Sequence, residues 1–174
     1  MVFHLLEAGE IAPLAEALLA LWQRAFAGHP YFVQPKDLPR VKRLFQRHLE
    51  TPGFRAVVAF RRGSPVGFAY GFPRRAGEPW TEEVSASLPI ALRREWFREA
   101  FGFVEFAVDP AYQGIGVGST LHDRLLATVR EPRAVLTVHA HAPAARFYVR
   151  RGWRRLGWLR GTPYWILGKE LVRD

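Results

Sequence analysis

Apolar residues recur along the chain at two spacings, one typical of strands and one typical of helices. Short apolar runs bounded by Gly, Pro or polar residues predict seven strands, at 2–6, 54–60, 65–72, 103–108, 134–138, 153–159 and 164–171. Apolar residues three or four apart predict four helices, at 10–26, 37–49, 120–129 and 143–151. Residues 85–100 predict one or two further short helices.

The order of these elements is β-α-α-β-β-(α)-β-α-β-α-β-β. A hairpin-rich first half followed by β-α-β crossovers predicts an α/β fold with a mixed sheet. The chain has 174 residues, which favours a single domain over 1–174, because two domains would each have a small core.

Composition narrows the classes of protein. Cysteine is absent, which excludes disulfides, a thiol nucleophile and thiolate metal sites. The apolar N-terminal segment has no basic start and is interrupted by Glu7, Glu10 and Glu16, so it does not resemble a signal peptide, and no other run is long enough to span a bilayer. We therefore expect a cytoplasmic protein with no membrane partner.

The formal net charge is +9, almost entirely from Arg. Such a charge favours an anionic partner, which is a nucleic acid, an anionic membrane face or a phosphate-rich small molecule. The excess of Arg over Lys is equally well explained by a GC-rich genome, so charge alone does not choose a partner.

A glycine-rich turn lies between a predicted strand and a predicted helix. Gly114, Gly116 and Gly118 alternate there, and the amides at the start of the following helix, together with the helix dipole, favour an anion. No Lys-Ser/Thr follows, so the turn is not a P-loop, and G-x-G-x-G is a poor dinucleotide fingerprint. The turn therefore predicts a phosphate cradle of another kind.

Two sequence blocks identify that kind. The first is Q-x-x-G-x-G, from Gln113 to Gly118, which follows the predicted strand 103–108 and the Asp109-Pro110 that stops it. The second is H-x-P-A-x-x-x-Y-x-x-x-G-W, from His141 to Trp153. Together they resemble the pyrophosphate motif and the later Asn-Ala-Tyr-Gly-Phe motif of the GNAT superfamily of N-acetyltransferases, over roughly 103–153. The departure is His141, where the family commonly has Asn.

The resemblance implies a mixed, mostly antiparallel sheet that is splayed between strands 4 and 5 and flanked by helices. Acetyl-CoA would be the co-substrate, with its pantetheine along the open edge of strand 4 and its pyrophosphate on the glycine turn. The cofactor-binding residues implied are Phe106, Ala107, Val108, Gln113, Gly114, Ile115, Gly116, Val117, Gly118, Ser119, His141 and Ala144. Whether His141 contacts CoA is left open.

The reaction would be attack of an amine on the thioester carbonyl, which needs a base, an oxyanion donor and an acid. Glu105 is the candidate base, because it is one acid on an otherwise apolar strand and burial raises the pKa of a carboxyl; alternatively it pairs with an arginine or orients the substrate. The resemblance implies the Val108 amide as oxyanion donor and Tyr148 as general acid, while a purely packing role for Tyr148 is the alternative.

The remaining polar residues give weaker signals. His139 and His141 form an H-x-H pair without an evident third ligand, so no metal is expected. His122 and Asp123 are expected on a solvated helix face. The family resemblance places the acceptor pocket near 27–36 and 73–85, and the aromatic residues of the first half supply candidate walls. Those aromatic residues are Trp22, Phe26, Tyr31, Phe32, Tyr70, Phe72, Trp80 and Trp96. Three acids of the second loop are candidates to attract a cationic amine, namely Glu78, Glu82 and Glu83.

Three functions remain open from the sequence. The favoured one is acetyl transfer to the primary amine of a small molecule or protein. The second is acetyl transfer to a nucleic-acid-linked acceptor such as an aminoacyl-tRNA, for which the +9 charge would form one contiguous patch. The third is a non-catalytic acyl-CoA-binding sensor. A homodimer through Trp158, Tyr164 and Trp165 is also an option, although these residues are equally suited to a core.

Overall fold

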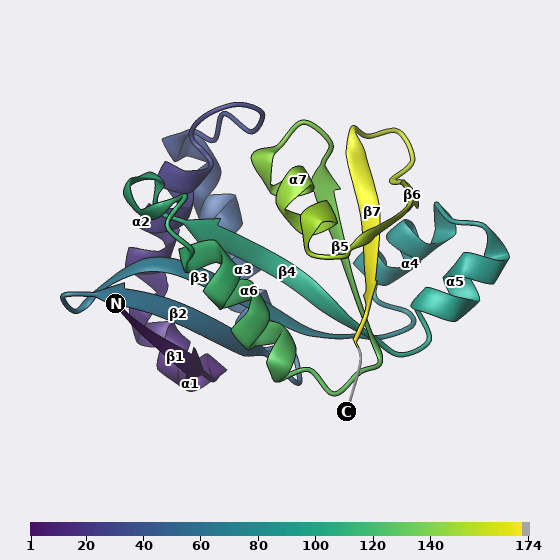
Figure 1. Ribbon diagram of the computed structural model, residues 1–174, viewed down its shortest axis with the longest axis horizontal. Coiled ribbons are helices and arrows are strands. Elements are labelled where there is room, and N and C mark those ends of the chain that lie inside the picture. The colour runs from purple at the N-terminus through teal and green to yellow at the C-terminus, as the bar shows by residue number, and fades with distance from the viewer. Residues whose placement is uncertain (172–174) are drawn as a thin grey trace. The chain divides into compact units, whose positions relative to one another are not determined.

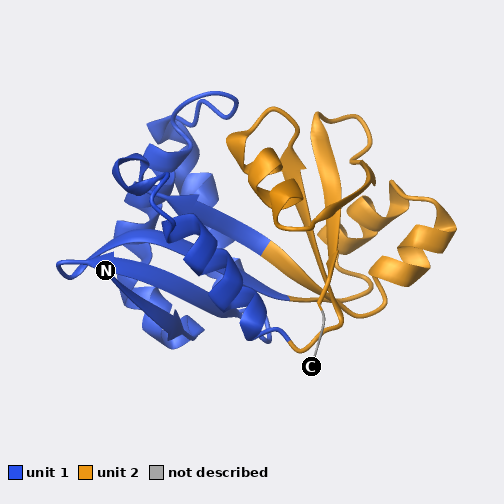
Figure 2. Cartoon of the chain, in the orientation of Figure 1, with its two compact units in different colours: residues 1–72, 104–129 blue, residues 73–103, 130–174 orange. Residues whose placement is uncertain are grey.

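A computed structural model describes residues 1–171 and divides the chain into two compact units (Figure 2). Unit 1 contains Met1–Phe72 and Val104–Val129, and unit 2 contains Pro73–Phe103 together with the chain from Arg130 onward. Each unit is therefore built from two separate stretches of sequence. The single domain predicted over 1–174 stays a prediction.

The strands form a seven-stranded sheet in the order β1-β2-β3-β4-β5-β7-β6 (Figure 1). They are β1 (Val2–Leu6), β2 (Arg55–Arg61), β3 (Ser64–Arg74), β4 (Ala100–Val108), β5 (Arg133–His139), β6 (Arg154–Trp158) and β7 (Tyr164–Glu170). Within residues 1–171, β4 and β5 pair in parallel through 100–102 and 133–135, whereas β1–β2, β2–β3, β5–β7 and β6–β7 pair antiparallel. The mixed, mostly antiparallel α/β class is confirmed, and so short a parallel pairing agrees with the predicted splay.

Seven α-helices accompany these strands within residues 1–171. They are α1 (Ala8–Ile11), α2 (Ala15–Ala25), α3 (Leu38–Leu49), α4 (Pro79–Ala86), α5 (Ile90–Trp96), α6 (Val117–Ala127) and α7 (Pro143–Arg150). The helix predicted at 10–26 is divided by a 3₁₀ turn at Ala12–Leu14, because Pro13 has no amide to continue the α-helical ladder.

Asp37 stabilises the turn that precedes α3. Its carboxylate accepts a hydrogen bond from the Gln34 amide at 2.9 Å, and it makes no side-chain cap to α3. The carboxylate therefore belongs to the 3₁₀ turn at Pro35–Asp37 and not to the start of the helix.

Unit 1 has helices on both faces of its strands, with α6 on one face and α2 and α3 on the other (Figure 1). Leu18 and Leu21 of α2 and Phe45 of α3 pack against Phe68 and Tyr70 of β3, and all five side chains are buried. Because successive strand residues face opposite sides, the neighbours of Phe68 and Tyr70 face α6.

His122 corrects the predicted solvated face of α6. Its side chain is 2% exposed, whereas that of its neighbour Asp123 is 60% exposed. His122 belongs to the buried face of α6 with Leu121 and Leu125, since residues three or four apart share one side of a helix. Its Nδ1 lies 2.7 Å from the Asp123 carboxylate, so the buried imidazole keeps a polar partner.

Gly67 on β3 allows α6 to approach the sheet closely. A Cβ added at Gly67 would lie 2.9 Å from Leu121 Cδ1 and 3.3 Å from both the Ala107 carbonyl oxygen and Val117 Cγ1. The absence of a side chain at this position therefore fixes the distance between the sheet and the start of α6.

We expect Gly67→Ala to lower the free energy of unfolding by about 1–3 kcal/mol, the usual cost of overpacking a close-packed core. Chemical denaturation would measure it. Gly9→Ala is the matched control, because a Cβ at Gly9 meets nothing within 4 Å. Equal stability of the two variants would contradict the close approach.

Unit 2 has its own apolar core. Val84 of α4 and Trp96 of α5 pack with Val135 of β5 and Ile166 of β7, and all four are fully buried. Ala100 belongs to this cluster. Phe103, three residues along β4, instead contacts Tyr148 of α7, as the alternation of strand side chains requires.

Candidate functional site

The glycine turn connects β4 to α6 within unit 1. Gly114 and Gly116 have φ angles of +76° and +89°, a left-handed backbone that glycine adopts without the steric strain of a Cβ. A Cβ at either position would meet nothing within 4 Å, so the space beside both glycines is open. Gly116 is the N-cap of α6, and the first hydrogen bond of that helix runs from the Thr120 amide to the Gly116 carbonyl at 3.1 Å.

Two side chains shape the entry to this turn. The Asp109 carboxylate accepts from the Ala111 amide at 3.0 Å and pairs with Arg24 of α2 at 2.8 Å. The Gln113 side-chain amide donates to the Val108 carbonyl at 2.9 Å. The Gln113 side chain therefore stabilises the turn from within. The groups left to bind an anion are the backbone amides at the N-terminus of α6.

Gly118 has a packing role inside α6. A Cβ there would lie 3.1 Å from Phe106 Cζ, so the aromatic ring of β4 lies directly against the first turn of the helix. Phe106 thus faces α6. Glu105, the residue before it on β4, faces the other side of the sheet.

Glu105 of β4 is partly buried on the side of α2 and α3. Loss of solvation raises the pKa of the Glu105 carboxyl from 4.5 to about 7. The Trp22 indole N–H and the Phe106 amide oppose this rise, because both favour the ionised form. Trp22 Nε1 is buried and makes no hydrogen bond of ordinary geometry, but of the two opposing groups it has the larger effect on the Glu105 pKa.

Tyr70 of β3 lies beside Glu105. Its hydroxyl is 2.9 Å from His48 Nδ1 of α3. Burial, and after it the negative charge of Glu105, raises the pKa of Tyr70 well above 10, which keeps this phenol neutral. Tyr70 therefore lines the cavity as a neutral phenol. Glu105, whose pKa is about 7, is the carboxyl beside it that changes charge near neutral pH.

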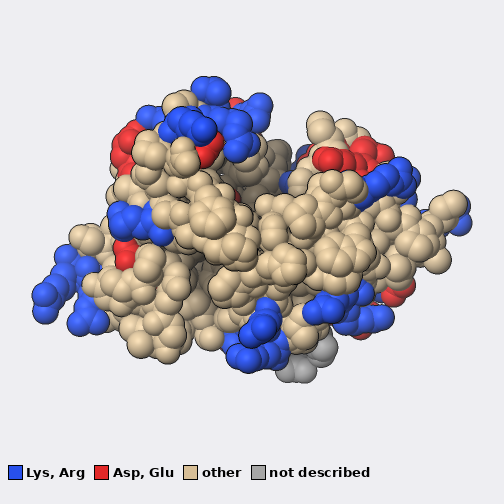
Figure 3. Space-filling model, turned by 90° about the horizontal axis from the view of Figure 1, so that it is seen from above, with Lys and Arg blue, Asp and Glu red and all other residues tan. Residues whose placement is uncertain are grey.

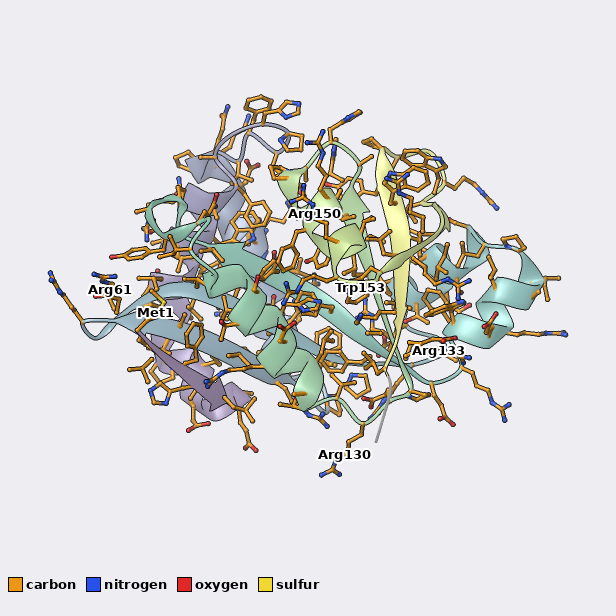
Figure 4. All side chains as sticks on the ribbon, in the orientation of Figure 1. Met1, Arg61, Arg130, Arg133, Arg150 and Trp153 are labelled. Carbon is orange, nitrogen blue, oxygen red and sulfur yellow. The ribbon has the colours of Figure 1, made fainter. Side chains whose placement is uncertain are left out.

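Tyr148 lies in unit 2, on α7, and its side chain is buried. Its ring is 5.9 Å from Phe103 and 5.6 Å from Trp153, both edge to face; Trp153 is labelled beside α7 in Figure 4. The helix ends in a Schellman motif, in which the Trp153 amide bonds the Tyr148 carbonyl at 3.1 Å and Gly152 has φ +83°. The Y-x-x-x-G-W spacing is thus a helix stop that locks the tyrosine ring.

His141 precedes α7 and is exposed, and Ala144 is the second residue of the helix. The His141 amide donates to His139 Nδ1 at 3.2 Å, so one function of this His-x-His pair is to shape the turn between β5 and α7. Within residues 1–171 no group of three or more metal-ligating side chains is found.

The predicted acceptor residues fall into two groups. Trp22 and Tyr70 do line a cavity that reaches Glu105, but no residue of 27–36 does. In unit 2, Glu78 pairs with Arg74 at 3.8 Å and Glu82 with Arg93 at 3.0 Å. Apart from Trp22, sequence reasoning missed the cavity walls contributed by α2 and α3, because their apolar spacing indicates only a buried face. These walls are Leu18, Leu19, Val41, Leu44 and Phe45.

The surface charge is divided. Figure 3 shows Lys and Arg in several separate groups among uncharged residues on the face in view. Within residues 1–171, no helix has the length and apolar character needed to cross a bilayer.

Comparisons with known proteins agree with this geometry. One similar solved structure is a histone acetyltransferase HPA2 and related acetyltransferase from Corynebacterium glutamicum, with 22% sequence identity, coverage of 100% of this chain and 99% of that chain, and a TM-score of 0.67. A second is the paia N-acetyltransferase from Thermoplasma acidophilum in complex with coenzyme A, with 14% identity, coverage of 98% of this chain and 100% of that chain, and a TM-score of 0.63. A third is a GNAT family acetyltransferase from Brucella melitensis in complex with acetyl-CoA, with 20% identity, coverage of 99% of this chain and 90% of that chain, and a TM-score of 0.61. No curated protein sequence matches.

The sequence itself matches a family model over residues 15–153, which is most of the chain and runs through both units. The model describes the acetyltransferase (GNAT) family, and its match spans the glycine turn, Glu105 and the block that ends at Trp153. The chain belongs to the GNAT acetyltransferase family.

Proposed function

We propose that the protein transfers an acetyl group from acetyl-CoA to a primary amine by direct attack in a ternary complex. The observation that carries this proposal is the Glu105 carboxyl, whose pKa is raised to about 7 by burial. Glu105 lies on β4, the strand that precedes the glycine turn. A general base works best when its pKa lies near the working pH.

In the proposed reaction, Glu105 accepts one proton and Tyr148 donates one. The amine nitrogen forms a bond to the thioester carbonyl carbon, and its proton goes to Glu105. The C–S bond then breaks, and the departing CoA sulfur takes a proton from Tyr148. The Val108 amide is the proposed donor to the oxyanion between these steps.

The glycine turn is proposed to bind the pyrophosphate of acetyl-CoA. Open space beside Gly114 and Gly116 allows a phosphate to approach the backbone, and the start of α6 supplies amides and a favourable dipole. Phe106, Ala107 and Val108 are proposed to bind pantetheine, and His141 and Ala144 are proposed as further cofactor-binding residues. The whole chain, 1–174, would act as one cytoplasmic enzyme.

The function is tested by free-thiol release from acetyl-CoA with a panel of primary amines, with the acetylated product identified by mass spectrometry. The result expected is thiol release that requires an amine and yields one acetylamine per thiol. Tight acetyl-CoA binding with no amine-dependent release would favour the sensor reading. Retention on tRNA that falls steeply with salt would favour a nucleic-acid-linked acceptor.

We expect Gly116→Ala to weaken acetyl-CoA binding about tenfold or more. A Cβ at φ +89° is strained, and turning the first amides of α6 away loses charge-assisted hydrogen bonds of about 1.5–3 kcal/mol each. Isothermal titration of the folded variant would measure the Kd.

Gly161→Ala is the matched control for this variant. Gly161 also has a positive φ, +73°, and a Cβ there would meet nothing within 4 Å, but it lies in the turn between β6 and β7 and is not assigned to the cofactor. Equal affinity in Gly116→Ala, Gly161→Ala and the unaltered protein would show that the turn does not hold the pyrophosphate.

A further inference from the structure

A second cavity lies in unit 2, between α4 and α5, the two helices that connect β3 to β4 along the chain (Figure 1). Its volume is about 560 Å³, within the range of pockets that bind small molecules. The buried residues Thr81 and Ser85 of α4 line it, together with the apolar side chains of Ile90 and Phe97. All of its lining residues lie within 76–98, so the cavity belongs to unit 2 alone.

The charged side chains of this cavity are mostly positive. Arg93, Arg94 and Arg98 line it, and within the described part of the chain Glu82 is the one acid that does so. Glu82 is already engaged, because its carboxylate pairs with Arg93 at 3.0 Å and accepts a hydrogen bond from the Gly77 amide at 2.9 Å. The positive charges of Arg94 and Arg98 are therefore in excess at this cavity.

Neighbouring acids do not neutralise these two arginines. Among residues 1–171, neither the Arg94 nor the Arg98 side chain forms an ion pair or a hydrogen bond. Glu95, the next residue on α5, pairs with Arg133 at 3.7 Å, and Glu99 lines a different cavity. Two unpaired guanidinium groups at one cavity favour an anionic ligand there.

We infer that this cavity binds a phosphorylated small molecule, with its phosphate on Arg94 and Arg98 and its apolar part against Ile90 and Phe97. A phosphate monoester carries nearly two negative charges at pH 7, which matches the two unpaired guanidinium groups, whereas a single carboxylate would match only one. The planar guanidinium also binds phosphate through two parallel hydrogen bonds. The inference is independent of acetyl transfer, because neither Glu105 nor the glycine turn contributes to the cavity.

The test uses aromatic probes that share a ring and differ in charge. Each is titrated into the ¹⁵N-labelled full chain and followed by NMR, which gives both the Kd and the residues affected. We expect phenyl phosphate to bind about tenfold or more tightly than benzoate and to shift amide signals within 76–98, and phenol to bind more weakly than either. Phthalate, a dicarboxylate, binding as tightly as phenyl phosphate would reject the phosphate assignment. Shifts confined to other residues would reject the cavity.

Substitution of the two arginines gives a second arm. We expect Arg94→Gln and Arg98→Gln each to weaken phenyl phosphate binding about tenfold or more, because each removes charge-assisted hydrogen bonds. Both side chains are exposed, so the fold should be retained. Arg130→Gln is the matched control, since Arg130 (labelled in Figure 4) is an exposed arginine of unit 2 that lines a cavity with Glu99 and Glu131 instead. An equal Kd in all these variants would overturn the inference.

Coenzyme A is the remaining source of phosphate that the test must separate from this ligand. We expect phenyl phosphate to bind with the same Kd in the presence and absence of excess CoA, and Arg94→Gln to leave the Kd of CoA unchanged. Loss of phenyl phosphate binding when CoA is added, together with weaker CoA binding in Arg94→Gln, would assign these arginines to the donor site and reject a separate ligand.

Discussion

Glu105→Gln should lower kcat at saturating acceptor by about 10²–10⁴-fold, the usual contribution of general base catalysis. It should also abolish the ascending limb of the kcat–pH profile. In the unaltered enzyme this limb should bend near pH 7, because burial raises the pKa of Glu105 to about 7 and only the ionised carboxylate accepts a proton. Steady-state thiol release between pH 5.5 and 9 would measure both effects.

The two roles considered for Glu105 give different kinetics. A carboxylate that only orients the amine would raise KM for the acceptor on removal, with kcat nearly unchanged and the bend near pH 7 retained. Glu50→Gln is the matched control, since Glu50 is an exposed acid at the end of α3. A Glu105→Gln enzyme with the kcat of this control would reject the base assignment.

The pH dependence of the free energy of unfolding reports on the Glu105 carboxyl without any substrate. The folded-state pKa of Glu105 lies above 4.5, so the folded protein binds this proton more tightly than the unfolded chain. The free energy of unfolding should therefore decrease as the pH rises from about 4.5 to about 7. Glu105→Gln should lack this part of the decrease, which denaturant titrations at several pH values would detect.

Much of the fold follows from local sequence rules. The glycines before α6 suit the left-handed backbone found at Gly114 and Gly116, and the Tyr148-to-Trp153 spacing is a Schellman stop. The break at Pro13 is equally local, because proline has no amide, but the prediction of one helix over 10–26 missed it. The glycine turn and the helix stop involve residues within a few positions of one another, so they can be predicted from the sequence alone.

The acceptor side is not predictable in this way. The cavity at Glu105 joins Leu44 of α3 and Trp22 of α2 to Tyr70 of β3, residues that are far apart in the sequence. Trp22 and Tyr70 are two of the eight aromatic residues that the sequence offers as candidate walls, and nothing in the sequence separates them from the other six. Leu44 has an aliphatic side chain that is typical of an ordinary core. The burial of His122 likewise depends on which face of α6 meets the sheet. Only tertiary packing distinguishes these residues from others of the same type.

Tyr148→Phe is the second variant expected to have a large effect. Its ring is held edge to face by Phe103 and Trp153 at 5.9 and 5.6 Å, and phenylalanine keeps that ring. The substitution therefore removes the hydroxyl with little change in packing, and stability should stay within about 1 kcal/mol. We expect kcat to decrease by about 10²-fold or more through loss of the proton for the departing CoA sulfur, with KM for acetyl-CoA little changed.

Leaving-group dependence separates an acid role from a packing role for Tyr148. An acetyl donor whose leaving thiol is more acidic needs less protonation, so it should recover turnover in Tyr148→Phe more than in the unaltered enzyme. A loss of equal size with both donors would indicate a positional effect and reject the acid assignment. Tyr164→Phe on β7, which removes a phenol hydroxyl elsewhere in unit 2, should retain full turnover with both donors, because no proton of the reaction is assigned to it.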